Sequence, residues 1–108
     1  ALVLAIYRIT RDFPREEQFG LVSQLRRAAV SITSNIAEGF SRLSYKEKRQ
    51  FYTIALGSLT ETQNQLLIAR DIGYIPKDKF SNIAEQTIKV SKIANGLIKK
   101  SDSIIHNS

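Results

Sequence analysis

The sequence contains no cysteine and only one histidine, His106, among its 108 residues. Without cysteine the chain can form neither disulfide bonds nor thiolate metal sites, and mechanisms that use a catalytic thiol are excluded. The lone histidine lies near the end of the chain and offers no triad. The Glu-x-x-His pairs that line metal-binding helical bundles do not occur. We therefore expect no enzymatic activity, no catalytic residue, no metal and no cofactor.

Glycine and long apolar runs are also scarce. The five glycines are isolated from one another, so no loop resembles a phosphate-cradling motif. The sequence has no uninterrupted apolar run of membrane-spanning length and no signal peptide. These features predict a cytoplasmic protein without a membrane partner.

Acidic residues are outnumbered by basic ones. Ten Asp and Glu face 16 Lys and Arg, which gives a formal net charge of +6. This balance favours an anionic partner such as nucleic acid, or it serves solubility alone. The length suits one small domain, and 43% apolar residues are typical of a folded chain. Because Ala1 falls inside an apolar periodic pattern, we expect the sequence to be the ordered part of a longer protein.

Apolar residues recur at helical spacing in four segments. This periodicity predicts helices at residues 1–13, 21–38, 45–72 and 77–100. Short connectors between them predict an all-α, antiparallel up-down four-helix bundle over residues 1–100. Residues 101–108 are expected to form a frayed tail.

Local signals set the expected ends of these helices. Pro14 ends the first helix, and Gly39 is expected just past the end of the second, in a left-handed conformation. A Ser-x-x-Glu capping box at Ser44 begins the third, and Gly73 stops it. Lys99 and Lys100 are expected in the last turn of the fourth helix, where cations complement the helix dipole.

The third predicted helix carries more apolar residues than one core-facing stripe needs. A bundle core uses about three positions in seven. The surplus predicts a second buried face and hence a homo-oligomer. Gly57 weakens the middle of this helix, which would make sense if another helix passes close by.

An unusual row of polar residues lies in residues 26–40, RRAAVSITSNIAEGF. Ser34, Asn35 and Glu38 follow Ser31 at steps of three and four along one helix flank. Such a row usually faces water. The alternative is a buried network that fixes helix and subunit geometry, whose candidate members are Arg26, Arg27, Ser34, Asn35, Glu38 and Glu61. Two carboxylates could also serve acid–base chemistry, but Glu38 and Glu61 are more typical as ion-pair partners of arginine.

Two long runs resemble the signatures of a known family. Residues 13–40, FPREEQFGLVSQLRRAAVSITSNIAEGF, and residues 55–75, ALGSLTETQNQLLIARDIGYI, are similar to those of the four-helix bundle proteins encoded in 23S ribosomal RNA intervening sequences. The resemblance implies an antiparallel bundle that assembles as a homopentameric ring. It also relates the chain to the accessory variability protein of diversity-generating retroelements, which binds reverse transcriptase and nucleic acid.

Two departures from the family pattern stand out. Thr33 replaces the proline that many members have in their SIPSNIAEG run, so any kink there would be weaker. The aromatic-rich segment with a tryptophan that usually precedes this point is absent before Ala1.

The basic residues give the first functional hypothesis, an oligomer that binds the RNA or DNA backbone. Its primary candidates crowd the start of the third helix: Arg42, Lys46, Lys48 and Arg49. Secondary candidates lie on the fourth: Lys89, Lys92 and Lys99. Tyr45 and Tyr52 lie nearby and could stack on bases, although tyrosines at helical spacing are more often core or interface residues. The rival hypothesis is a structural or adaptor ring that docks a protein such as a reverse transcriptase.

Overall fold

Four α-helices and one 3-10 turn make up the computed structural model, which describes residues 1–107. The helices are α1 (Leu2–Thr10), α2 (Leu21–Ser41), α3 (Tyr45–Ile72) and α4 (Lys77–His106). The turn η1 (Arg15–Glu17) connects α1 to α2. Residues 1–107 contain no strand. The predicted all-helical fold with four helices is therefore confirmed.

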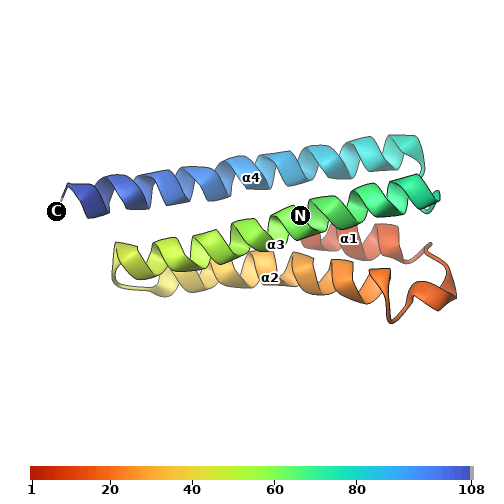
Figure 1. Ribbon diagram of the computed structural model, residues 1–108, viewed down its shortest axis with the longest axis horizontal. Helices are drawn as coiled ribbons and strands as arrows, with labels where there is room; N and C mark the ends of the chain where they lie inside the picture. The colour runs from red at the N-terminus through yellow and green to blue at the C-terminus, as the bar shows by residue number, and fades with distance from the viewer. Residues whose placement is uncertain (108) are drawn as a thin grey trace.

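Successive helices run in opposite directions along a body of 51 × 24 × 18 Å (Figure 1). α3 packs against both α2 and α4, and α1 lies against α2 and α4. α1 has nine residues, whereas α2 has 21. It therefore covers only the half of the bundle nearest the α3–α4 turn (Figure 1).

The core follows the apolar stripes of all four helices. Ile6, Leu25, Leu59 and Leu66 are at most 1% exposed. Burial of each such side chain contributes about 1.5–3 kcal/mol. The cluster as a whole comprises Leu2, Ile6, Phe13, Val22, Leu25, Ala29, Ile32, Leu59, Leu66, Ala69, Ile75 and Ile83.

An apolar groove of about 470 Å³ remains open between α2 and α4, beside the first residues of α1. Ile32, Ile36 and Phe40 line it from α2, and Val90 and Ile93 line it from α4. The groove lies where the bundle has three helices instead of four. As a result Phe40 and Ile93 are 60% and 57% exposed.

The predicted ends of the first two helices were wrong. α1 ends at Thr10 and not at residue 13, because the Phe13 ring turns inward to meet Tyr74, with ring centroids 5.3 Å apart. α2 continues through Gly39 to Ser41. Gly39 is buried against α3 and does not have the left-handed conformation expected of it, whereas Gly73 does, with φ of 97°.

The predicted frayed tail is helical through His106, and Arg49 of α3 forms an ion pair with Asp102 in this part of α4. Ser101 is buried, and Ile104 and Ile105 are half-buried. Lys99 and Lys100 therefore do not lie in the last turn of α4, contrary to the prediction. Ser108, the last residue of that predicted tail, lies outside the described residues.

Within the described chain, no other helix passes close to Gly57. Apart from its chain neighbours and the nearby backbone of α3, no atom lies within 4 Å of a Cβ built at this position. In residues 1–107, no helix combines the length and apolar character needed to cross a membrane.

Candidate nucleic-acid interface

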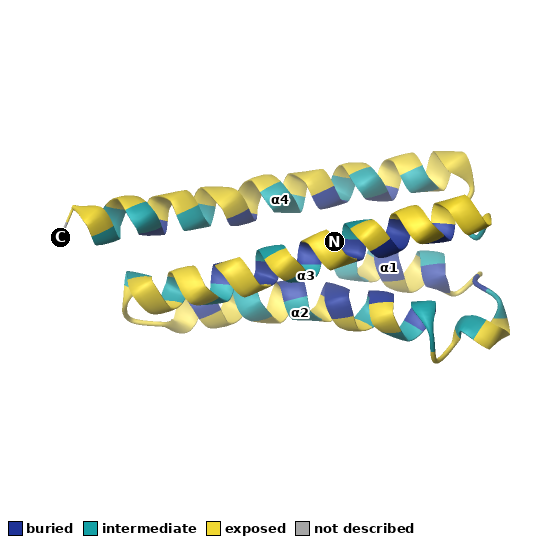
Figure 2. Ribbon diagram, in the orientation of Figure 1, coloured by how far each residue is buried: buried dark blue, intermediate teal, exposed yellow. Residues whose placement is uncertain are grey.

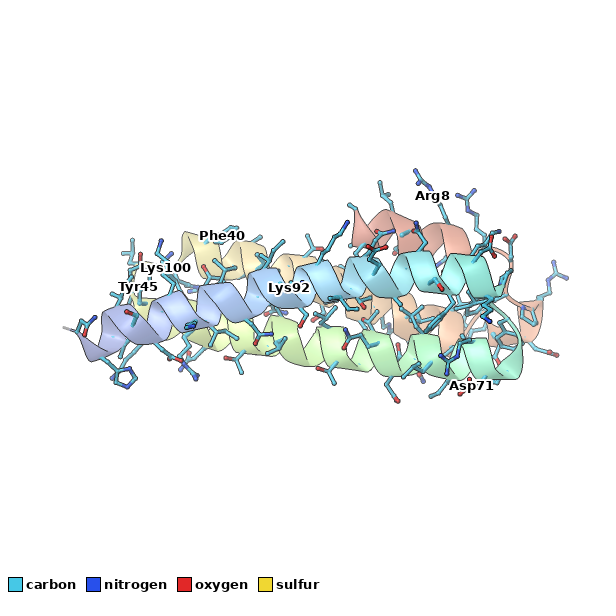
Figure 3. The ribbon with its side chains drawn as sticks, turned by 90° about the horizontal axis from the view of Figure 1, so that it is seen from above. Arg8, Phe40, Tyr45, Asp71, Lys92 and Lys100 are labelled. Carbon is cyan, nitrogen blue, oxygen red and sulfur yellow. The ribbon has the colours of Figure 1, made fainter. Side chains whose placement is uncertain are left out.

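The turn between α2 and α3 brings four of the predicted residues together: Arg42, Lys46, Lys48 and Arg49 form the turn cluster. Ser44 positions them by capping α3, since its hydroxyl oxygen accepts a hydrogen bond of 3.2 Å from the Glu47 amide. Arg42 precedes the cap in extended conformation, with φ −77° and ψ 149°. The cluster therefore lies at one end of the bundle, near Phe40, Tyr45 and Lys100 (Figure 3).

Lys48 and Arg42 have partners within this end of the chain. The Lys48 ammonium donates to the carbonyl oxygens of Gly39 and Phe40, at 3.1 and 3.0 Å. These carbonyls belong to the last turn of α2, where a cation is favoured by the helix dipole. The Arg42 guanidinium pairs with Glu38 at 3.0 Å. Both cations therefore stabilise the end of α2 and the turn into α3.

The other two members of the turn cluster differ from each other. The Arg49 guanidinium forms an ion pair with Asp102, which links the start of α3 to the C-terminal end of α4. Lys46 is exposed and makes no ion pair with any residue among 1–107. Lys46 is thus the one cation of the cluster without a competing partner in that part of the chain.

The nearby tyrosines occupy different environments. Tyr52 is 3% exposed and packs edge-on against Phe40, with centroids 5.9 Å apart. Burial, with a smaller contribution from Tyr45, raises the pKa of Tyr52 above the ordinary tyrosine value. Tyr45 is half-buried, with the Lys48 ammonium 5.8 Å from its ring centroid. Tyr52 is therefore a core residue that cannot stack on a base.

Four exposed lysines lie along α4 from its middle toward its C-terminal end: Lys89, Lys92, Lys99 and Lys100, which we name the lysine row. Their spacing spreads them over about 16 Å of helix. Residues 86–101 contain no aspartate or glutamate. The side of α4 turned away from α3 is exposed along its length (Figure 2). The row therefore presents positive charge to solvent, and the nearest acids along α4 are Glu85 and Asp102, beyond the two ends of the row.

No ion pair involves the lysine row in the described part of the chain. Lys92 lies further toward the middle of α4 than Lys100 (Figure 3). Sequence reasoning counted Lys100 among the basic residues that line the fourth helix, but named only Lys89, Lys92 and Lys99 as candidates. The absence of acids from residues 86–101 is the sequence signal that would have added Lys100.

The predicted polar row divides between two environments. Ser31 and Ser58 share a hydrogen bond of 2.8 Å between α2 and α3. Asn35 reinforces it, since its amide donates to the Ser31 carbonyl at 2.8 Å and to the Ser31 hydroxyl at 3.1 Å. Ser34 and Glu38 are exposed instead. Only part of the row lies between helices, and the rest faces solvent.

The six residues proposed as one buried network do not meet within a single chain. Arg26 contacts α1, where its Nε donates to the Thr10 hydroxyl at 3.0 Å. Arg27 is exposed, and the exposed Glu61 accepts from the Gln65 amide at 3.2 Å. Glu38 pairs with Arg42, and neither Arg26 nor Arg27 reaches it in the described ion pairs. The arginines and carboxylates of that prediction thus have separate local partners.

Apolar side chains are also exposed outside the groove. On α3, Ile54, Ile68 and Ile72 are 51%, 43% and 54% exposed. Ile54, Glu61 and Ile68 follow one another at intervals of seven residues and share one helix face. Within residues 1–107, no group of three or more histidine, aspartate or glutamate side chains is placed to hold a metal ion.

The family model of the 23S rRNA-intervening sequence protein matches residues 1–96. The chain belongs to this family. The match covers α1, α2 and α3 completely and most of α4, including Lys89 and Lys92 of the lysine row. The resemblance to this family, noted above from residues 13–40 and 55–75, is therefore confirmed.

A crystal structure at 1.70 Å resolution has a similar fold, with a TM-score of 0.78 and 23% sequence identity. It is a protein with unknown function from the S23 ribosomal protein family of Bacteroides thetaiotaomicron VPI-5482, and the likeness covers 90% of this chain and 88% of that one. At this identity the likeness shows the shared fold alone. No curated protein matches the chain.

Proposed function

We propose that this family member is a non-catalytic, oligomeric protein that binds the backbone of RNA or DNA through the lysine row. The observation that carries the proposal is the row itself: four exposed lysines on a stretch of α4, residues 86–101, that holds no acid. Lys46 extends the surface at the same end of the bundle. Lysine acts on phosphates as a point charge and reads no sequence. The expected binding is therefore sequence-independent.

The salt dependence of this binding can be estimated from the release of counterions by the nucleic acid. Four phosphate contacts on duplex DNA correspond to a slope of about −3.6 in log K against log salt. Between 50 and 200 mM salt, affinity would then fall by about 100-fold for one row. Contacts repeated over several subunits would steepen the slope and tighten binding through effective concentration.

Oligomerisation is the second part of the proposal. Ile54, Ile68 and Ile72 are exposed on one face of α3, which also carries Glu61. Large exposed apolar patches commonly mark protein interfaces. Copies of the chain that cover this face would also gather their lysine rows into one assembly. The family resemblance makes a pentameric ring the expected arrangement.

The test compares two variants with the same net charge. In the first, Lys89, Lys92, Lys99 and Lys100 are all changed to Gln. In the control, four exposed cations elsewhere are changed to Gln: Arg8, Arg11, Arg15 and Lys77. Each variant loses four charges. The affinity of each variant is measured for RNA and for DNA of about 20 nucleotides, each as a single strand and as a duplex. The measurements are made at 50 and at 200 mM salt.

We expect the lysine-row variant to lose at least 10-fold in affinity and most of the salt dependence, and the control to lose less than threefold. Equal losses would mean that net charge alone drives binding and would overturn the assignment to α4. No binding by the wild-type protein at 50 mM salt would end the proposal.

A second candidate function is an adaptor that docks a protein helix, and the apolar groove favours it. Its lining from Ile32, Ile36, Phe40, Val90 and Ile93 suits the apolar face of an amphipathic helix. Lys100 borders a smaller hollow that also includes Phe40, so acidic residues on the edge of such a helix would be complementary. Phe40→Ala separates the two functions: it should weaken helix binding and leave nucleic-acid affinity unchanged.

A further inference from the structure

A second surface, far from the lysine row along the chain, combines aromatic rings with arginines. It is a shallow hollow of about 630 Å³ between α1 and the first half of α2. We name it the aromatic shelf. Its principal lining residues are Tyr7, Phe19, Arg26, Arg27 and Val30.

Phe19 has the most exposed aromatic ring of the described chain, at 96%. The residues on either side of Phe19 are nevertheless hydrogen-bonded within the connection between η1 and α2. The Gln18 amide donates to the Arg15 carbonyl at 3.1 Å, and the Gly20 amide donates to the Glu17 carbonyl at 3.0 Å. An exposed phenylalanine forfeits roughly 2 kcal/mol of burial energy. The fold of the single chain gives no reason for a ring at this position.

Arg26 lines the same hollow as Phe19 and holds its positive charge in a fixed position. Its guanidinium lies over the Tyr7 ring, 4.6 Å from the centroid. Nε donates to the Thr10 hydroxyl at 3.0 Å, and Nη2 approaches the Tyr7 carbonyl at 3.5 Å. These contacts hold the planar group in one orientation without neutralising its charge.

The shelf holds two arginines and no carboxylate. The nearest acid along the chain, Glu17, has both oxygens engaged elsewhere. Its Oε1 accepts from the Leu21 amide at 3.4 Å, and its Oε2 accepts from the Tyr74 hydroxyl at 2.9 Å. Arg27 is exposed and has no ion-pair partner among residues 1–107. The charge of the shelf therefore suits an anionic occupant.

From these features we infer that the aromatic shelf binds single-stranded nucleic acid, with a base stacked on Phe19 and an adjacent phosphate at Arg27. A ring that is exposed on a rigid backbone can stack only on a base that is already unstacked from its neighbours, and single strands offer such bases. This inference rests on the proposed nucleic-acid-binding function and names its substrate class. The lysine row attracts the phosphates of single strands and duplexes alike, whereas the shelf favours single strands over duplexes.

The first experiment uses Phe19→Ala, with Leu43→Ala as its matched control. Leu43 is 99% exposed and lies in the α2–α3 turn, outside the shelf. Affinities for a 12-residue single strand and for the duplex of the same sequence are measured at 50 mM salt. Base stacking on an aromatic ring is worth about 1–3 kcal/mol, which corresponds to roughly 5- to 150-fold in affinity. We expect Phe19→Ala to lose at least fivefold on the single strand and less than twofold on the duplex, and Leu43→Ala to change neither.

The second experiment keeps the stacking and makes it visible. The chain contains no tryptophan, so Phe19→Trp introduces a single fluorophore. Its emission should be quenched by the single strand and not by the duplex, whereas Leu43→Trp should respond to neither. Arg27→Gln should weaken both variants on the single strand and reduce the salt slope by about 0.7.

The outcomes separate this inference from the proposed function. If nucleic acid binds and the lysine-row variant weakens it while Phe19→Ala has no effect, the shelf is overturned and the proposed function stands. If Phe19→Ala lowers the mass of the oligomer, the shelf is a contact between copies of the chain, and the inference is wrong. If the wild-type protein binds no nucleic acid, both fail.

Discussion

Gly39 of α2 lies directly against the ring of Tyr52 of α3. A Cβ at Gly39 would come 2.8 Å from Cδ1 of that ring and closer still to Cε1. The absence of a side chain at this position lets the two helices approach near their shared turn. The same contact helps to bury Tyr52 and holds α2 and α3 together beside the turn that carries the turn cluster.

Gly39→Ala should therefore destabilise the protein, although alanine favours a helix over glycine by up to about 1 kcal/mol. Overpacking costs about 1–3 kcal/mol, so after the gain in helix propensity the net loss should be up to about 2 kcal/mol. Gly57→Ala is the control, because its added methyl group meets open space. It should raise the free energy of unfolding in urea by about 0.5–1 kcal/mol. Equal stabilities for the two variants would contradict the close packing at Gly39.

The hydrogen bond between Ser31 and Ser58 predicts a non-additive pair. Ser31→Ala or Ser58→Ala alone leaves a half-buried hydroxyl without its partner and should cost about 1 kcal/mol. The double variant should cost less than the sum, because both polar groups are then gone. A double-mutant cycle in urea measures this coupling. Additive losses would show that the two hydroxyls do not interact in solution.

Local periodicity was sufficient to predict the four helices, because each buries one stripe of side chains at a step of three or four residues. The range of α3 was predicted in full, since Ser44 and Gly73 are strong boundary signals with local causes. The end of α2 was missed for a tertiary reason. A glycine after an apolar stripe is typical of a helix end, but Gly39 is required by a ring 13 positions later in the chain.

The candidate surfaces were harder to predict than the helices. Clustering of basic residues identified the turn cluster. The pairing of Arg49 with Asp102 and of Lys48 with the α2 carbonyls depends on packing between helices, whereas Arg42 and Glu38 are four residues apart and form a local pair. Residues 101–106 were expected to be a frayed tail, yet they are helical, and Arg49 of α3 pairs with Asp102 among them. The aromatic shelf had no sequence signal, because Tyr7 and Phe19 belong to different segments that only the α1–α2 connection brings together.

Arg26 should be essential for holding α1 in place. A helix of nine residues is too short to persist alone in water, so α1 depends on its contacts. Arg26→Lys keeps the charge but loses the planar group that stacks on Tyr7 and bonds Thr10. We expect faster amide hydrogen exchange in α1, with α3 unchanged. Arg27→Lys, one residue further along, is the control and should leave α1 protected. Equal exchange in α1 for wild type and Arg26→Lys would refute this anchoring role.

Tyr74 predicts a loss of stability at alkaline pH. Its hydroxyl donates to Glu17 Oε2 at 2.9 Å, and this hydrogen bond, followed by burial and the charges of Glu17 and Glu16, raises the Tyr74 pKa above its ordinary value of about 10. The folded state therefore retains the proton when the unfolded state has lost it. The stability that this tyrosine contributes is fully present below pH 10, and it is lost as the pH rises through the folded-state pKa.

Tyr74→Phe should accordingly reduce the difference in urea midpoint between pH 9 and pH 11. It should not abolish the difference, because burial also raises the pKa of Tyr52. Glu17→Gln is the companion variant: it keeps Tyr74 and removes the acceptor charge, so the Tyr74 pKa should return toward its ordinary value and the alkaline loss should shrink similarly. A Tyr74→Phe protein with the full wild-type loss between the two pH values would show that the Tyr74–Glu17 hydrogen bond does not couple to folding.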